Sequence, residues 1–429
     1  MLEWLFHLHA NGTNVKREVI AGLTTFLTMA YIIFVNPSIL QIAGMDFGAV
    51  FMATCLAAAF GSAFMGLYAN YPIALAPGMG LNAYFTFGVV KGMGFTWQVA
   101  LGAVFISGLI FLAISLFRIR EWIIEAIPQS MKLGIAAGIG LFLGIIALEN
   151  AKMIVAHPAT LVTLGDVKSW QVILAAAGFV LIGGLSARRV PGAILISILA
   201  VTAVSIALGL STFGGIVSAP PSIAPTFLQM DLKGALALGL WSIIFVFLFV
   251  DLFDNTGTLI AIAQRGDMLD KEGRLPRIGR ALTVDSTSAF VGAALGTSTT
   301  TSYIESAAGV DAGGRTGLTA VVVALCFIAA IFFAPLAGSV PAFATAPALF
   351  YVACLMARGL RDLDWDDVTE FVPAMACAIT MPLTFSIAHG IGIGFIVYAA
   401  IKVLAGRVGE VKPVAALLAL AFILKMAVG

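Results

Sequence analysis

The chain has 429 residues, of which 61% are hydrophobic and 10% are charged, and its formal net charge is +1. Globular proteins carry about 25% charged residues, so a chain of this composition could not cover a water-exposed surface with polar groups. The composition excludes an ordinary soluble protein and favours an all-α polytopic membrane protein in contact with a lipid bilayer. The near-zero net charge excludes nucleic acid as a partner, because it offers no basic field for a polyanion.

Apolar segments recur along the whole chain. A helix needs about 20 predominantly apolar residues to cross the hydrocarbon of a membrane. About fourteen segments fit: 18–42, 48–69, 73–90, 97–117, 130–149, 169–187, 191–209, 235–263, 280–296, 298–312, 315–334, 343–357, 369–387 and 389–405. A further apolar stretch, 413–427, is too short to assign as a span.

The basic residues predict the orientation of these spans. With the N-terminus inside, the cytoplasmic side receives 18 of the 23 lysines and arginines, the other side receives four, and Lys425 is left unassigned. Cytoplasmic loops of membrane proteins carry such an excess. We therefore expect a multi-pass protein of the plasma (inner) membrane with a cytoplasmic N-terminus, the loop 265–280 inside and the loop 152–168 outside.

The third and tenth segments are poor helices. Residues 72–82 contain prolines and glycines, and residues 297–302 are all serine or threonine. Irregular backbone is tolerated at membrane depth only where protein or a watery cavity satisfies its polar groups. Two helices kinked by ordinary glycine and proline are the alternative interpretation.

Each broken segment is the third in a set of seven spans. Because seven is odd, the second set must run with inverted topology. We expect a first inverted repeat over 1–210, a connection over 211–234 and a second inverted repeat over 235–429 with the C-terminal apolar segment. Paired breaks in two inverted halves indicate the midplane binding site of a secondary transporter.

Four carboxylates lie within these spans: Asp251, Asp254, Asp285 and Glu305. Acids at the bilayer centre cost about 2.5–3.5 kcal/mol each, so they are functional candidates by default. Asp254 and Glu305 each lie beside a glycine- or threonine-rich break, which favours a binding role. For Asp251 and Asp285 the alternative is structural, as a partner of another polar group or as a packing residue. Histidine and cysteine spacing forms neither a metal cluster nor a nucleophile–base pair, so no metal, cofactor or enzymatic activity is expected.

An acidic loop precedes the thirteenth segment. We interpret it as solvated and leading into a helix N-terminus. Its acidic residues are Asp364, Asp366, Asp367 and Glu370.

Six motifs together resemble the AzgA-like purine permeases. These are the hypoxanthine/guanine/adenine branch of the nucleobase–ascorbate (nucleobase:cation symporter) superfamily. The resemblance covers essentially the whole chain, through residues 21–31, 34–37, 75–84, 252–259, 303–309 and 313–320.

The resemblance implies seven plus seven inverted spans divided into a core and a gate domain. Short antiparallel strands in segments 3 and 10 would meet at the base. In uracil- and xanthine-type relatives, acids on the eighth and tenth spans hold the nucleobase. The matching residues here are Asp254, where the uracil type has a glutamate, and Glu305, while Thr258 replaces a histidine. The remaining substrate-binding candidates are Tyr303, Ile304 and Asn82, with Asp285 and Asp251 as supporting or proton-coupling residues.

This reading predicts secondary active import of purine nucleobases by proton symport with alternating access. Carboxylates accept hydrogen bonds from purine N–H groups. The sequence shows no extramembrane domain for ATP, so we expect an ion gradient to drive uptake. The preferred base, among guanine, hypoxanthine and adenine, stays open. So does the oligomeric state, a homodimer included.

Two rival functions stay open. An anion transporter of the same fold, moving sulfate or bicarbonate, would favour basic residues or helix N-termini at the breaks, where this chain has carboxylates. A passive channel is commonly a symmetric pore with a repeated lining, and nothing in the sequence suggests one.

Overall fold

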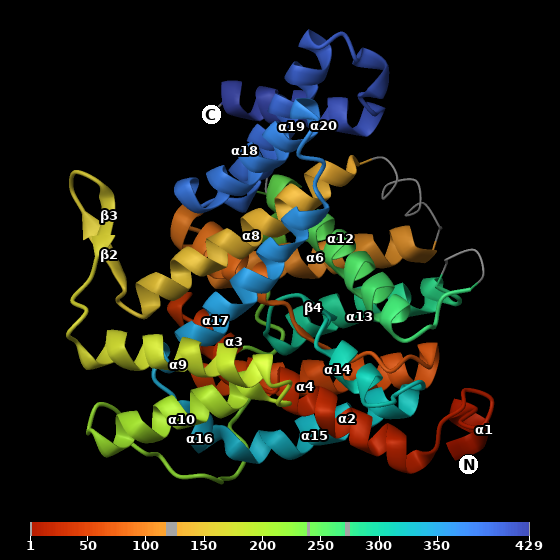
Figure 1. Cartoon of the computed structure of the whole chain (residues 1–429), viewed down its shortest axis with the longest axis vertical. Coiled ribbons are helices and arrows are strands. Elements are labelled where there is room, and N and C mark those ends of the chain that lie inside the picture. The colour runs from red at the N-terminus through yellow and green to blue at the C-terminus, as the bar shows by residue number, and fades with distance from the viewer. Residues whose placement is uncertain (1, 117–126, 238–240, 271–274, 429) are drawn as a thin grey trace.

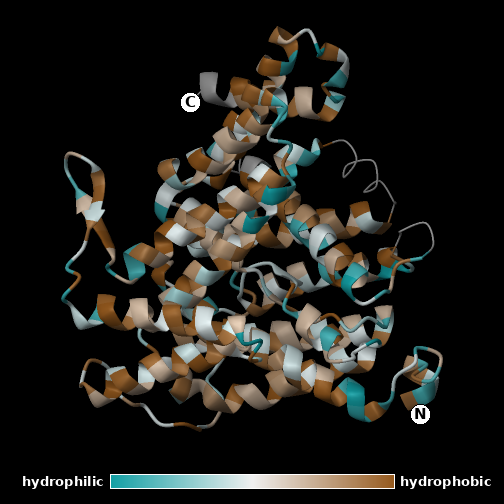
Figure 2. Cartoon of the chain, in the orientation of Figure 1, coloured by the Kyte–Doolittle hydropathy of each residue, from teal (hydrophilic) through white to brown (hydrophobic). Residues whose placement is uncertain are grey.

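The computed structural model describes residues 2–116, 127–237, 241–270 and 275–428, and it is predominantly helical. Figure 1 shows many of the long helices running across the picture, with strand β4 near the middle. Apolar residues predominate along these helices in Figure 2.

The first half of the chain is mostly helical and is interrupted by a strand in its third predicted segment. Its helices are α1 (Leu2–Phe6), α2 (Val15–Met29), α3 (Ile32–Ile42), α4 (Phe47–Phe64), η1 (Met65–Ala69), α5 (Met79–Ala83), η2 (Tyr84–Gly92), α6 (Trp97–Leu116), α8 (Gln129–Asn150), α9 (Trp170–Ala187) and α10 (Ala193–Ala207). Its strands are β1 (Leu75–Pro77), β2 (Ile154–His157) and β3 (Leu161–Leu164).

The second half repeats the interruption at strand β4 (Thr300–Ser302). Its helices are α11 (Leu232–Ala237), α12 (Trp241–Arg265), α13 (Ile278–Leu295), α14 (Ser306–Asp311), α15 (Gly317–Ala330), η3 (Ile331–Phe333), α16 (Ala334–Gly338), α17 (Ala342–Ala357), η4 (Arg358–Asp362), α18 (Val368–Thr384), α19 (Ile387–Leu404), η5 (Val408–Glu410) and α20 (Pro413–Val428).

Within the described residues, each predicted segment falls on one or more elements of the structure. Residue 117 of the fourth segment and residues 238–240 of the eighth lie outside the described residues. Nine helices in the described ranges are long and apolar enough to cross a membrane by themselves. The third and tenth segments are strand-plus-helix elements, as predicted. The stretch expected to be too short for a span is helix α20.

The hairpin β2–β3 was not predicted. Its strands pair antiparallel, with Ile154 opposite Leu164 and His157 opposite Leu161, and Figure 1 shows the hairpin projecting from the ends of α8 and α9. A turn residue with positive φ, Lys152 at 57°, leads into it. The strand sequences, Ile-Val-Ala-His and Leu-Val-Thr-Leu, lack the alternation of apolar and polar residues that indicates a strand in a sequence.

Backbone turns explain where the strands begin. Gly296 closes α13 with φ 95°, a left-handed conformation that glycine adopts without a Cβ penalty. In the first half, Asn70 ends η1 with φ 54°, and asparagine tolerates that region better than most residues. After each turn the chain enters the paired strands instead of continuing as a helix.

The helices pack in two groups. In one, α4 and α6 pack against α13, and α15 packs against α2 and α4. In the other, α8 packs against α17 and α18, α9 packs against α17, and α18 packs against α19. This grouping supports the predicted division into a core and a gate, and the strands β1 and β4 belong to the first group.

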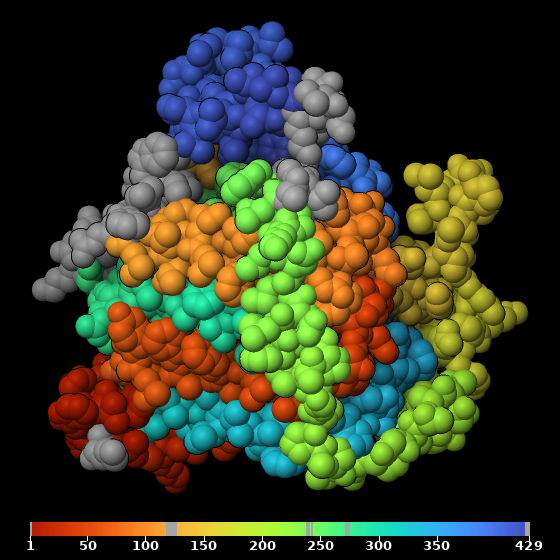
Figure 3. All heavy atoms as spheres, turned by 180° about the vertical axis from the view of Figure 1, so that it is seen from behind, coloured from red at the N-terminus to blue at the C-terminus, as the bar shows by residue number. Residues whose placement is uncertain are grey.

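The connection 211–234 lies along the outside of the first group. Figure 3 shows it as a light-green band running along the rear of the molecule. Backbone hydrogen bonds hold it against the helices. Ser218 N donates to Phe332 O at 3.0 Å, and Asp231 N donates to Gln98 O at 2.9 Å. The connection therefore ties the end of α15 to the start of α6.

Candidate functional site

Strands β1 and β4 meet antiparallel at the centre of the first helix group. Leu75 lies opposite Ser302 and Pro77 opposite Thr300, and both strands are buried throughout. Backbone hydrogen bonds of 2.9 Å beyond each end extend the pairing. The two broken segments thus satisfy each other's backbone, as irregular structure at membrane depth requires.

Glu305 follows β4 and is half-buried. The hydroxyl of Tyr31 donates a 2.6 Å hydrogen bond to its Oε1 atom. Tyr31 is 1% exposed and lies between α2 and α3, where the first predicted span is interrupted. Because Oε1 is engaged, Oε2 is the carboxylate oxygen left for a ligand.

Asp254 lies on α12 and is exposed. Thr258 follows one turn later, on the same helix face, and is half-buried. Asp254 has no hydrogen-bond partner among the described residues, and its carboxylate interacts electrostatically with that of Glu305. The acids of the eighth and tenth segments therefore lie within electrostatic range of each other, and their membership of one site stays a prediction.

Behind this pair lies a buried polar network. Asn255 Nδ2 donates to Asp251 Oδ1 at 3.1 Å, and Asn255 Oδ1 accepts from the backbone N of Ser302 at 2.9 Å. Asp285 Oδ1 accepts from the backbone N and from Oγ of Ser302, each at 3.1 Å. Its Oδ2 atom is buried without a partner among the described residues.

Asp251 and Asp285 are buried, at 1% and 0% exposure. They therefore act on the site through the backbone of β4 rather than by touching a ligand directly. Sequence reasoning missed Asn255 and Ser302. Only the spacing of Asn255, four residues after Asp251, could have indicated the first of these contacts.

Asn82 is fully buried. Its Nδ2 donates to Asn36 Oδ1 at 2.6 Å, and its Oδ1 accepts from Ser298. Asn36 in turn donates to Thr297 at 2.8 Å. Both ends of the Asn82 amide are engaged, so in this structure Asn82 holds the start of the tenth segment and offers no free polar atom to a base. Its predicted direct contact with a substrate stays a prediction.

Tyr303 and Ile304 take different positions. Tyr303 is 5% exposed, and its hydroxyl donates to Pro77 O at 2.6 Å, so it braces the strand pair. Ile304 is 45% exposed and adds apolar surface beside Glu305. Of the predicted substrate-binding residues, Asp254, Thr258, Ile304 and Glu305 retain accessible surface.

The site faces the second helix group. Lys132 of α8 places its Nζ atom 5.5 Å from the ring centroid of Phe253, and Phe253 is the neighbour of Asp254. The part of α12 next to Asp254 therefore contacts the second helix group.

The motif 313–320 serves the packing of α15. Glu18, fully buried, accepts hydrogen bonds from Arg315 N at 2.9 Å, Thr319 N at 3.2 Å and Thr319 Oγ1 at 2.6 Å. A carboxylate there satisfies the first free N–H groups of a helix. Glu18 was overlooked in the sequence because it stands at the start of a span.

The acidic loop before α18 is only partly solvated. Asp367 caps α18 as predicted. Its pKa falls to about 2, through hydrogen bonds from Thr369 and the guanidinium of Arg407. Glu370 departs from the prediction, since it pairs at 2.7 Å with Lys402, whose side chain is 0% exposed. The loop therefore also anchors α19.

Comparison with known proteins agrees with this arrangement. The model of the Permease family (Xan_ur_permease) matches residues 16–393. The chain is 51% identical over 426 residues to "Adenine permease AdeP" of Escherichia coli, covering 99% of this chain and 96% of that one. It is 47% identical over 435 residues to "Guanine/hypoxanthine permease PbuG" of Bacillus subtilis, covering 99% of each.

A solved structure shares the fold. The transmembrane domain of the cyanobacterial bicarbonate transporter BicA superposes with a TM-score of 0.65 at 17% identity, covering 90% of this chain and 97% of that one. At that identity the likeness concerns the fold alone.

Proposed function

This chain belongs to the Permease family and is a transporter rather than an enzyme, and from that premise we propose that it imports purine nucleobases by proton symport. Guanine, hypoxanthine and adenine are the candidate substrates, because the similar permeases are named for them. We place the protein in the inner membrane with its N-terminus in the cytoplasm.

The observation that carries the proposal is that Asp254 of α12 and Glu305, which follows β4, lie within electrostatic range of each other. A purine edge carries ring N–H or amino donors beside acceptor atoms, and carboxylate oxygens accept from such donors. Ile304 supplies apolar surface for the ring. An anion would meet two carboxylates here, so the fold shared with a bicarbonate transporter does not favour anion transport.

Proton coupling follows from the same pair. Two carboxylates within electrostatic range disfavour simultaneous ionisation, so the pair would hold one proton. A protonated acid donates a hydrogen bond to a purine acceptor while the charged one accepts from a donor. Loss of the proton on the cytoplasmic side would remove that donor and loosen the base.

The buried acids support this cycle. Asp285 and Asp251 hold the backbone and hydroxyl of Ser302 directly or through Asn255. Their contacts fix the end of β4 and hence the start of the turn that carries Glu305. We assign them a supporting role.

Uptake tests the substrate class. A strain that lacks its own purine permeases, expressing this chain, should take up labelled guanine, hypoxanthine or adenine, and unlabelled purine bases should compete. Nucleosides should not compete, because a ribose would have to fit between the strand pair and the second helix group. Strong uptake of inosine or uridine without uptake of free bases would contradict the proposal.

A further inference from the structure

A cavity separate from the candidate site lies at the end of the first helix group that carries the excess of basic residues. It has a volume of about 410 Å³, which is within the range of small-ligand pockets. Its walls come from the turn after α1, Tyr71 before β1, residues 266–268 after α12, residues 276–277 before α13, and Arg315 two residues before α15. None of these residues belongs to the site described above.

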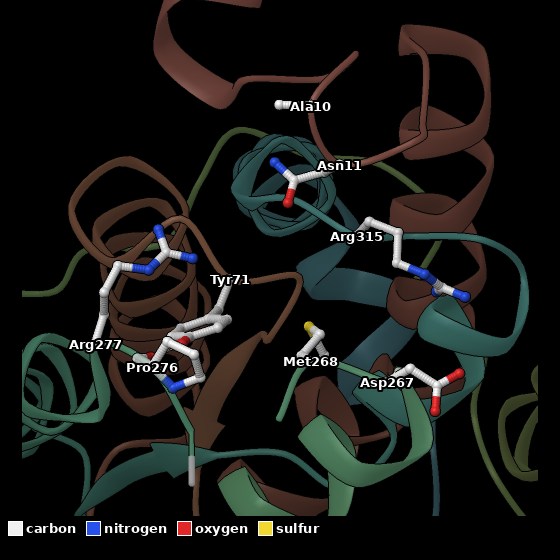
Figure 4. A pocket seen from close by; sticks show the side chains of 9 residues that line it. Ala10, Asn11, Tyr71, Asp267, Met268, Pro276, Arg277 and Arg315 are labelled. Atoms are coloured by element: carbon white, nitrogen blue, oxygen red, sulfur yellow. Dashed lines mark hydrogen bonds between the residues drawn. The ribbon is translucent and has the colours of Figure 1, made fainter. Parts of the chain in front are cut away.

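Two guanidinium groups line this cavity. Figure 4 shows Arg277 and Arg315 on opposite sides of it, with the Tyr71 ring beside Arg277 and Asp267 on the side of Arg315. The Arg277 guanidinium lies 4.9 Å from the centroid of that ring. One guanidinium nitrogen of Arg315 donates hydrogen bonds to the carbonyls of Val310 and Gly314. Its other nitrogens can donate hydrogen bonds to a ligand.

The lining carries an excess of one positive charge. Among the described residues that line it, Asp267 is the one carboxylate. Among the described residues no carboxylate lies within ion-pair distance of either guanidinium, whereas nearby Arg265 is paired with Asp311 at 2.7 Å. A single phosphate charge matches this balance, and arginines bind phosphate oxygens through paired N–H donors.

The surroundings place the cavity at the depth of lipid headgroups. Helix α1 exposes Trp4 by 79%, while Phe6 and Leu8 pack inward against Leu318. Exposed aromatic residues next to a buried apolar face are typical of the membrane interface.

Residues near the cavity, around the end of α4 and the start of α13, show the same pattern. Tyr68 is 45% exposed and Leu67 is 55% exposed, and the Arg280 guanidinium lies 5.7 Å from the Tyr68 ring centroid. Basic pockets between membrane helices on the cytoplasmic side are suited to phospholipid headgroups.

We propose that this cavity binds the phosphate of an anionic phospholipid headgroup from the leaflet that faces the basic side of the protein. The bound phosphate contacts residues that precede β1 and residues that precede α15. It therefore holds the two broken segments together at one end. The inference rests on the proposed orientation but not on the identity of the transported base. Its failure would therefore leave the purine proposal untouched.

Lipid retention tests the inference. The full chain is purified in detergent with phosphatidylglycerol or phosphatidylcholine, retained lipid is counted by native mass spectrometry, and thermal unfolding is followed in parallel. Phosphatidylglycerol should be retained preferentially and should raise the unfolding temperature. Arg277→Gln should lower its apparent affinity about fivefold, as expected for one basic group near the surface.

Two further variants sharpen the test. Asp267→Asn should increase retention, and asparagine suits the position because Asp267 has φ 50°. Arg188→Gln removes a charge from an exposed position at the end of α9 and should behave as the unmodified protein. An increase with Asp267→Asn would support the site even if Arg277→Gln failed to fold.

Two results would overturn the inference. One is equal retention of both lipids by the unmodified protein, unchanged in Arg277→Gln and Asp267→Asn. The other is stabilisation by inorganic phosphate as strong as that by phosphatidylglycerol, which would assign the cavity to soluble phosphate instead.

Discussion

At the scale of single residues, the site combines exposed groups with buried ones that hold them. Asp254 and Glu305 keep accessible surface, whereas Asp251 and Asp285 are buried behind β4. An intramembrane carboxylate is expensive unless hydrogen bonds or a watery cavity satisfy it. The exposed pair and the buried pair of carboxylates meet this requirement in different ways. Substitutions in the two pairs should therefore have different effects on transport.

Glu305→Gln should abolish accumulation of purine against a gradient more completely than Asp251→Asn. Glutamine keeps the size of the side chain but can neither ionise nor carry the transported proton, whereas Asp251 acts through Asn255. Uptake of labelled purine with both variants at matched expression measures the difference. Protonophore-sensitive accumulation by Glu305→Gln would show that the coupling carboxylate is another residue.

Tyr31→Phe should weaken apparent affinity while leaving expression unchanged. The substitution removes the 2.6 Å hydrogen bond to Glu305 and leaves the ring in place. Hydrogen bonds to charged groups contribute about 1.5–3 kcal/mol, so the KM should rise about 10- to 100-fold. Phe26→Leu, on the same segment, is the control for altered packing. An unchanged KM in Tyr31→Phe would remove Tyr31 from the site.

At the scale of elements, the crossing of β1 and β4 leaves no spare room. A Cβ atom at Gly78 would lie 2.6 Å from Thr301 Cγ2, although the φ of −74° at Gly78 suits any residue. Small residues are therefore required at this crossing by packing rather than by backbone conformation.

Gly78→Ala should impair transport and lower the unfolding temperature, since overpacking costs about 1–3 kcal/mol. Thr301→Ser removes the methyl group that clashes. The double variant Gly78→Ala/Thr301→Ser should recover much of the loss, measured by uptake and thermal unfolding. If Thr301→Ser gave no recovery, the contact would not be the cause.

Asp367 at the start of α18 predicts a pH effect. Its pKa is about 2 in the folded chain and about 3.9 in an unfolded one. The stabilisation is therefore fully present above about pH 4 and is lost as the pH falls towards 2. Asp367→Asn keeps a capping oxygen but removes the charge, so thermal unfolding of this variant should depend less on pH in that window. An identical pH dependence would contradict the assignment.

The sequence predicted the elements better than their contacts. Prolines, glycines and carboxylates are costly inside a membrane, so the two broken segments and their acids stood out. Tyr31 is 274 positions from Glu305, and Asn255 is 47 positions from Ser302. Such pairings depend on how the halves pack, which local patterns do not encode. For the same reason the sequence did not indicate that both polar atoms of the Asn82 amide are hydrogen-bonded.

At the scale of the whole molecule, the orientation in the membrane remains a prediction from the basic residues. The loop after α12 and the hairpin β2–β3 should face opposite sides. Ala159→Cys in the hairpin and Gly279→Cys at the start of α13 are both exposed positions and suit labelling in a background without the four native cysteines.

An impermeant thiol reagent added to intact cells should label Ala159→Cys and leave Gly279→Cys unlabelled until the cells are opened. The expectation follows from the excess of basic residues on one side. Labelling of both positions from outside would mean that the number of crossings between them differs from the prediction by an odd number.

The most direct test of the account is purine uptake by the purified chain in proteoliposomes under an imposed pH gradient. We predict that an acidic exterior alone drives labelled purine above its external concentration, and that a protonophore abolishes this accumulation. Glu305→Gln vesicles should show none. Accumulation that ignores the pH gradient, or mere equilibration of purine in the unmodified protein, would contradict proton symport through this site.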